Sequence, residues 1–180
     1  MEVVAARPEP EVSAALTTSD FVECYLAHYP RVVRALVLSG ADRATAEDLA
    51  QEAFARSLPK WRRVSRGANP PGYVYTAAFR LLQRHSRRAG RWKLGDVDEI
   101  STSPSTAPST GPSSTEAAAT TSVALEAVLA VMPPKRRACA VMCLLVGLSP
   151  AEAGEALGIA DGTVRKHLEA ARQDLQVLRD

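Results

Sequence analysis

Residues 149–167 read SPAEAGEALGIADGTVRKH, and this stretch decides the fold. Ser149 can accept a hydrogen bond from the backbone N–H of Glu152, and the Glu152 side chain can bond back to the N–H of Ser149, which predicts a capping box. Pro150 suits the first helical position, and Gly158 suits a helix end in the left-handed conformation. A second, basic helix starts three residues later. The stretch therefore predicts a helix-turn-helix, whose second helix enters the DNA major groove.

The composition fits a globular protein without a membrane span. The chain has 180 residues, of which 46% are hydrophobic, enough for one domain or two small ones. No apolar run approaches the roughly 18–20 residues that a transmembrane helix needs. The N-terminus lacks the basic start and apolar stretch of a signal peptide. We therefore expect a cytoplasmic protein with no membrane insertion.

Positive charge is concentrated in one part of the chain. The net charge is only +2, yet the segment from Lys60 to Lys93 holds ten basic residues and no acid. Aromatic residues are interleaved with them: Trp61, Tyr73, Tyr75, Phe79 and Trp92. This mixture favours a surface for a nucleic-acid backbone and exposed bases. The alternative is a solvated helix face above aromatic side chains of the core.

Hydrophobic spacing predicts an all-α fold made of two small helical domains. An amphipathic stripe begins at Phe21, a second helix runs from about Ala44 to Leu58 before Pro59, and a third runs from about Gly72 to Arg88. Ser, Thr, Pro and Ala then dominate, which is typical of a flexible linker. The predicted organisation is a disordered tail over 1–18, a helical domain over 19–94, a flexible linker over 95–122 and a second helical domain over 123–180.

Motifs in both halves resemble one family. Residues 46–56 read AEDLAQEAFAR, 132–137 read MPPKRR, and Leu157-Gly158, Gly162-Thr163-Val164 and Ala171-Arg172 follow in order. In these motifs the chain resembles the extracytoplasmic-function (ECF) sigma factors of bacterial RNA polymerase, the smallest group of the sigma-70 family. The resemblance implies sigma region 2 over the first domain and sigma region 4 over the second, with domain 3 absent.

The resemblance implies a polymerase contact on the second helix. Asp48, Gln51 and Glu52 would face the clamp helices of the β′ subunit of core RNA polymerase, and region 4 would meet the β flap. Acids and an amide at this spacing form one polar ridge on a helix. Without the resemblance, an ordinary solvated helix face would be the preferred interpretation.

The resemblance also implies two contacts with promoter DNA. For the −10 element, Asn69 and Tyr73 are the base-contact candidates, and the phosphate candidates are Arg62, Arg63, Arg66, Arg80, Arg84, Arg87 and Arg88. Tyr73 stands where the family usually has tryptophan, and Arg80 where it usually has asparagine. For the −35 element, Arg165 and Lys166 can reach base edges. The other candidates there are Lys135, Arg136, Arg137, Thr163, Glu169 and Arg172.

The sequence thus predicts an ECF-type sigma factor that binds core polymerase, recognises both promoter elements and promotes DNA melting. The alternative is a helix-turn-helix regulator that acts without being a polymerase subunit. An enzyme is disfavoured because no phosphate-binding glycine loop or nucleophile–base set is evident. Three cysteines at other than zinc-finger spacing predict no metal, and no cofactor is expected. An anti-sigma factor is a further partner that the sequence leaves open.

Overall fold

The computed structural model describes the backbone of residues 10–90 and 116–176, and the side chains of 19–90 and 123–176. Every described element is helical, so the predicted all-α class is confirmed for these residues. The first helix begins at Pro10, inside the stretch expected to be a tail, and positions 1–9 lie outside the described residues. Most of the expected linker, positions 95–115, also lies outside them.

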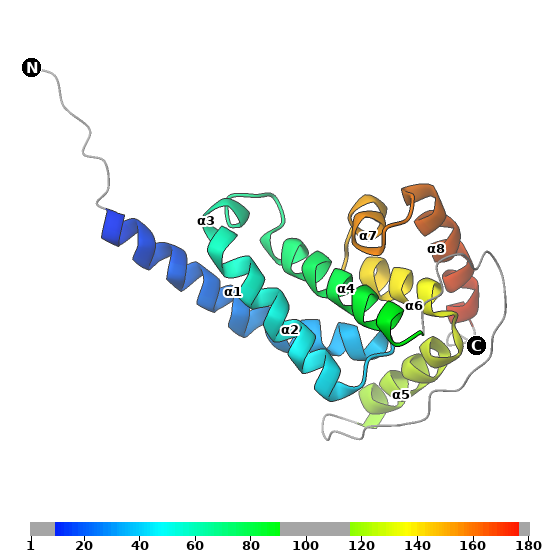
Figure 1. Cartoon of the computed structure of the whole chain (residues 1–180). Coiled ribbons are helices and arrows are strands. Elements are labelled where there is room, and N and C mark those ends of the chain that lie inside the picture. Colours follow the sequence, from blue (N-terminus) through cyan, green and yellow to red (C-terminus); the bar gives the residue numbers. More distant parts are fainter. Residues whose placement is uncertain (1–9, 91–115, 177–180) are drawn as a thin grey trace, which may run out of the picture.

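The N-terminal half contains three main helices, which Figure 1 shows in blue to green. They are α1 (Pro10–Leu38), α2 (Arg43–Ser57) and α4 (Pro70–Arg88), with the short turns η1 (Leu58–Lys60) and α3 (Trp61–Val64) between the last two. Asp42 caps α2 by accepting from the Thr45 N–H at 2.9 Å. Gly40 has φ +101°, which lets the chain reverse direction between α1 and α2.

The C-terminal half is built from shorter helices. They are α5 (Glu116–Val131), α6 (Pro134–Ala140), the π-helical turn η2 (Val141–Leu145), α7 (Pro150–Leu157) and α8 (Asp161–Gln176). The capping box is confirmed: the Ser149 N–H donates to the Glu152 carboxylate at 2.8 Å, and the Glu152 N–H donates to Ser149 Oγ at 3.2 Å. Gly158 has φ +65° and ends α7 as predicted. Hydrogen bonds from the Ser149 backbone N–H and from the Ser149 hydroxyl hold the pKa of the Glu152 carboxyl below its usual value.

Aromatic side chains form the core of the N-terminal half. Phe54 of α2 is 2% exposed, and its ring lies edge-on to those of Phe21 and Tyr25 of α1. Trp61 and Phe79 are also buried. Most of the aromatics interleaved with the basic segment therefore belong to the core, and the hypothesis that they offer a stacking surface for bases is wrong for these residues.

The two halves pack against each other along α4 and α7 (Figure 1). A smaller contact joins α1 to η2. The buried hydrophobic residues form one continuous cluster that extends from α1 to α8. The sequence predicted two tethered domains, and no local pattern indicated this contact between them. None of the helices in the described part of the chain is long and apolar enough to cross a bilayer.

Candidate nucleic-acid interface

Helix α8 presents a polar face opposite a buried one. Val164, Leu168 and Ala171 are buried against the rest of the C-terminal half. The predicted −35 residues on this helix are all exposed on the other side: Thr163, Arg165, Lys166, Glu169 and Arg172. Arg165, Lys166, Glu169 and Arg172 follow at spacings of one, three and three residues, which keeps these four on one face of the helix. The structure thus brings these five predicted contacts together on the second helix of the helix-turn-helix.

Arg165 already has a partner in the free chain. Its Nη2 lies 3.2 Å from Oδ2 of Asp161, one turn earlier on α8. Both side chains are exposed, and an exposed pair at this spacing stabilises a helix by only about 0.3–0.5 kcal/mol. The pair is therefore weak, and the Arg165 side chain can leave Asp161 and turn toward a base.

Two members of the basic cluster at 135–137, which the sequence offers as −35 candidates, have partners within the chain. Arg136 forms a 3.0 Å ion pair with Asp174 of α8. Arg137 Nη2 donates to the carbonyl of Ala130 and, at 3.2 Å, to that of Met132, so it satisfies carbonyls at the end of α5. Burial lowers the pKa of Arg137. Arg136 and Arg137 thus have partners within the C-terminal half, and the −35 role of the three residues 135–137 stays a prediction.

The basic face of α4 is exposed along most of its length. Arg80, Arg84, Arg87 and Arg88 all lie on the surface, while Val74, Ala78 and Leu82 of the same helix are buried. Arg62 and Arg63 on α3 and Arg66 in the following turn are exposed as well. The predicted −10 phosphate contacts are thus all exposed, four of them on α4 and three on α3 and the turn after it.

Asn69 has a structural task in addition to its predicted contact with a base. Its Oδ1 accepts from the Gly72 N–H at 2.9 Å, so it caps α4. A Cβ on Gly72 would lie 2.2 Å from Asn69 Nδ2, so only glycine leaves room for this cap. Tyr73, the other predicted base contact, is half-buried.

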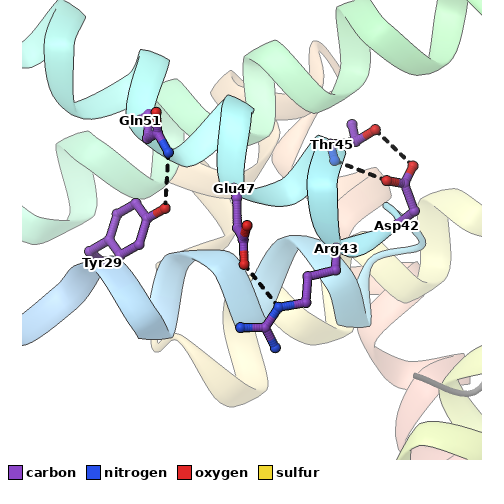
Figure 2. Close-up of polar contacts among 6 residues, drawn as sticks. All are labelled: Tyr29, Asp42, Arg43, Thr45, Glu47 and Gln51. Atoms are coloured by element: carbon purple, nitrogen blue, oxygen red, sulfur yellow. Dashed lines mark hydrogen bonds and ion pairs between the residues drawn. The ribbon is translucent and has the colours of Figure 1, made fainter. Parts of the chain in front are cut away.

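The predicted polymerase ridge is exposed on α2. Asp48, Gln51 and Glu52 lie on the surface above buried Leu49 and Ala53. Figure 2 shows Gln51 directed toward Tyr29 of α1, where its Nε2 donates to the tyrosine hydroxyl at 3.4 Å. Glu52 pairs with Arg56 at 2.5 Å on the same helix. The three side chains thus share the exposed face of α2, and Gln51 and Glu52 each have a partner within the chain.

The cysteine side chains are free thiols. Cys139 is buried, and burial raises the pKa of its thiol to about 12. Burial also raises the pKa of Cys24 and Cys143. Among the residues whose side chains are described, no three His, Cys, Asp or Glu side chains gather to form a metal site. A buried thiol such as that of Cys139 is typical of an inert core cysteine.

Comparison with known proteins gives the same two regions in the same order. The family model for sigma-70 region 2 matches residues 24–91, and the model for sigma-70 region 4 matches residues 122–175. The chain is 31% identical over 153 residues to the ECF RNA polymerase sigma factor SigE of Mycolicibacterium smegmatis. That match covers 83% of this chain and 57% of the relative, so the chain spans little more than half of the relative's length.

A solved structure shares the fold. The chain is similar, with a TM-score of 0.58 and 18% identity, to the sigma factor RpoE from Bartonella quintana, solved in complex with the anti-sigma factor NepR. The similarity covers 88% of this chain and 96% of that chain. The helical fold and the two matched regions define the class, and the chain belongs to the sigma-70 family of RNA polymerase sigma factors. The relative at 31% identity is a member of the ECF group of this family, the group that the sequence motifs resemble.

Proposed function

We propose that this chain is a transcription-initiation subunit that binds core RNA polymerase and directs it to promoters. One observation carries the proposal: an exposed acidic and amide ridge on α2 and two exposed basic faces, on α4 and α8, lie within regions 2 and 4 of a sigma-70 protein. These surfaces suit a protein partner and a nucleic acid respectively. As such a subunit, the chain would act in the cytoplasm, where bacterial polymerase works.

Each surface has a separate task in this proposal. The α2 ridge of Asp48, Gln51 and Glu52 binds the β′ clamp helices, and region 4 meets the β flap. The exposed face of α8 enters the major groove of the −35 element, where Arg165 and Lys166 reach base edges. The basic side of α4 follows the phosphates of the −10 element. These contacts set both the position and the orientation of the polymerase.

Melting of the −10 element breaks no covalent bond, so binding energy alone can drive it. A base that leaves the stack loses a few kcal/mol of stacking and pairing, which contacts to the opened strand must offset. The arginines of α4 can provide electrostatic contacts of this kind. Of the two base-contact candidates, Asn69 is engaged as the cap of α4 and Tyr73 is half-buried. Capture of a flipped base by Asn69 therefore requires its cap to rearrange.

We expect the double substitution Asp48→Lys/Glu52→Lys to weaken binding to core polymerase by about tenfold or more. The change places two cations where the proposal requires acids, on a surface that contributes little to the fold. The measurement is the dissociation constant for core polymerase, by fluorescence anisotropy of the labelled chain. The matched control is Asp20→Lys/Glu23→Lys, which makes the same charge change at exposed positions of α1.

Circular dichroism should show the same helix content for both double variants. The control variant should bind core polymerase with wild-type affinity. If the Asp48→Lys/Glu52→Lys variant binds core polymerase with wild-type affinity, the ridge on α2 is not part of the polymerase interface. Equal weakening by both variants would show that net charge, rather than the ridge, determines binding.

A further inference from the structure

A cavity of about 440 Å³ lies beside α1, bordered also by α5, η2 and the first turn of α4. Its volume falls within the range of roughly 300–1,000 Å³ that is typical of small-molecule sites. Aliphatic side chains such as Leu38, Leu125 and Leu148 form much of its lining, and no Asp or Glu of the described residues borders it. The cavity therefore combines apolar walls with basic side chains, which come from α1.

The basic side chains at the cavity lie on one face of α1. His28, Arg31 and Arg34 all border it, and their spacing of three residues keeps them near one another on the helix. Arg31 is exposed, so its guanidinium can meet a ligand that enters from solvent. The first turn of α4 borders the same cavity through Asn69 and Gly72, and the N-terminus of a helix favours an anion. Both elements thus favour a negatively charged group at this end.

His28 has an unused hydrogen-bonding atom. Its Nδ1 is buried and has no hydrogen-bond partner among the described residues. Burial and, to a smaller extent, the charge of Arg31 lower the pKa of His28, so the imidazole is neutral near pH 7. A neutral imidazole still donates one hydrogen bond. An oxygen atom of a bound acid would give Nδ1 the partner that it lacks.

One apolar wall of the cavity has an unusual backbone. In the π-helical turn η2 the Val146 N–H donates to the carbonyl of Val141, five residues earlier, at 3.0 Å. Such turns are frequent at functional sites. Residues five apart lie on different sides of an α-helix, whereas here both Val141 and Val146 line the cavity. The wider turn thus adds an apolar side chain to the wall.

We propose that this cavity binds a small amphipathic anion, a carboxylate with an aliphatic body, whose acid group meets Arg31 and His28. The proposal goes beyond the proposed function, which needs no small-molecule ligand. Arginine forms charge-assisted hydrogen bonds with a carboxylate, and the aliphatic body gains by leaving water. Since α1 lies in region 2 while η2 and the part of α5 at the cavity lie in region 4, the ligand would contact both regions.

Octanoate is a suitable probe, and isothermal titration calorimetry on the full chain measures its binding. We expect saturable binding with a dissociation constant of about 1 mM or below. Octan-1-ol and octylammonium have the same aliphatic body without the negative charge, and each should bind at least about fivefold more weakly. Absence of saturable octanoate binding, or equal binding of the three probes, would overturn the proposal.

Substitutions locate the probe in the cavity. Arg31→Gln should weaken octanoate binding by about three- to tenfold and leave octan-1-ol binding unchanged. Leu145→Trp enlarges a cavity-lining side chain that is 48% exposed, and it should weaken the binding of both probes.

The matched control is Arg43→Gln, which removes the charge of an exposed arginine on α2 away from the cavity. It should bind octanoate with wild-type affinity, and circular dichroism should show the same helix content for all three variants. Wild-type octanoate affinity in Arg31→Gln, or unchanged binding of both probes in Leu145→Trp, would show that the probe binds elsewhere and that the proposed site is wrong.

Discussion

Replacement of Phe54 by alanine should lower the free energy of unfolding by about 3–5 kcal/mol, the usual cost of truncating a buried phenylalanine. The Phe54 ring is 2% exposed, and its centroid lies 6.1 Å from that of Phe21, 5.0 Å from that of Tyr25 and 6.2 Å from that of Tyr29. The substitution leaves a cavity between α1 and α2 that these rings cannot fill without leaving their present positions. Since the proposed polymerase ridge lies on α2, the variant should lose core binding in proportion to the unfolded fraction.

Urea unfolding followed by tryptophan fluorescence measures this change in stability, because Trp61 is buried in the same cluster with its ring 5.2 Å from that of Phe21. The control is Leu58→Ala, which removes an apolar side chain that is 51% exposed. Its effect should stay within about 0.5 kcal/mol. A Phe54→Ala variant destabilised by less than about 1 kcal/mol would contradict the packing of α1 on α2.

Arg165→Ala should reduce promoter binding by holoenzyme by about 1–3 kcal/mol and relax the preference at one base pair of the −35 element. Arg165 lies at the N-terminal end of α8, where a recognition helix contacts base edges. Its partner Asp161 is on the same helix, so removal of the pair costs little stability. The measurement is holoenzyme affinity for a promoter and its single-base variants. Identical base preferences for wild type and variant would contradict a readout role.

Arg87→Ala and Arg88→Ala are the contrasting substitutions, because both side chains are exposed in the last turn of α4. Each substitution should weaken binding by a similar factor on all promoters. It should also reduce the slope of the logarithm of the binding constant against the logarithm of the salt concentration, by about one for each phosphate that is no longer neutralised. A salt titration of holoenzyme on the same promoter set measures this. An unchanged slope in both variants would show that neither arginine binds a phosphate.

The local features of this fold could be predicted because their causes lie within a few residues. The capping box joins Ser149 to Glu152, and Gly158 adopts the left-handed conformation that the end of α7 requires. The polar face of α8 follows from helical periodicity alone. The same holds for the α2 ridge, since buried Leu49 and Ala53 fix which side of the helix faces solvent.

The features that the sequence did not predict depend on partners that are distant along the chain. Arg136 pairs with Asp174, which is 38 residues away and becomes a neighbour only when α6 packs on α8. The Arg80–Glu155 contact joins residues that are 75 positions apart. A basic residue in a basic segment gives no sign that an acid from another domain will reach it. Which side of α4 faces α7 could therefore be determined only from the three-dimensional structure.

The proposed function requires that this chain turn core RNA polymerase into a promoter-specific enzyme. A direct test mixes the purified chain with core polymerase from the same bacterium and a library of genomic promoter fragments, and sequences the 5′ ends of the transcripts. We expect a stable complex of chain and core, with initiation at a defined set of start sites that share −35 and −10 sequences. Absence of a complex, or start sites identical to those of core polymerase alone, would contradict the proposed function.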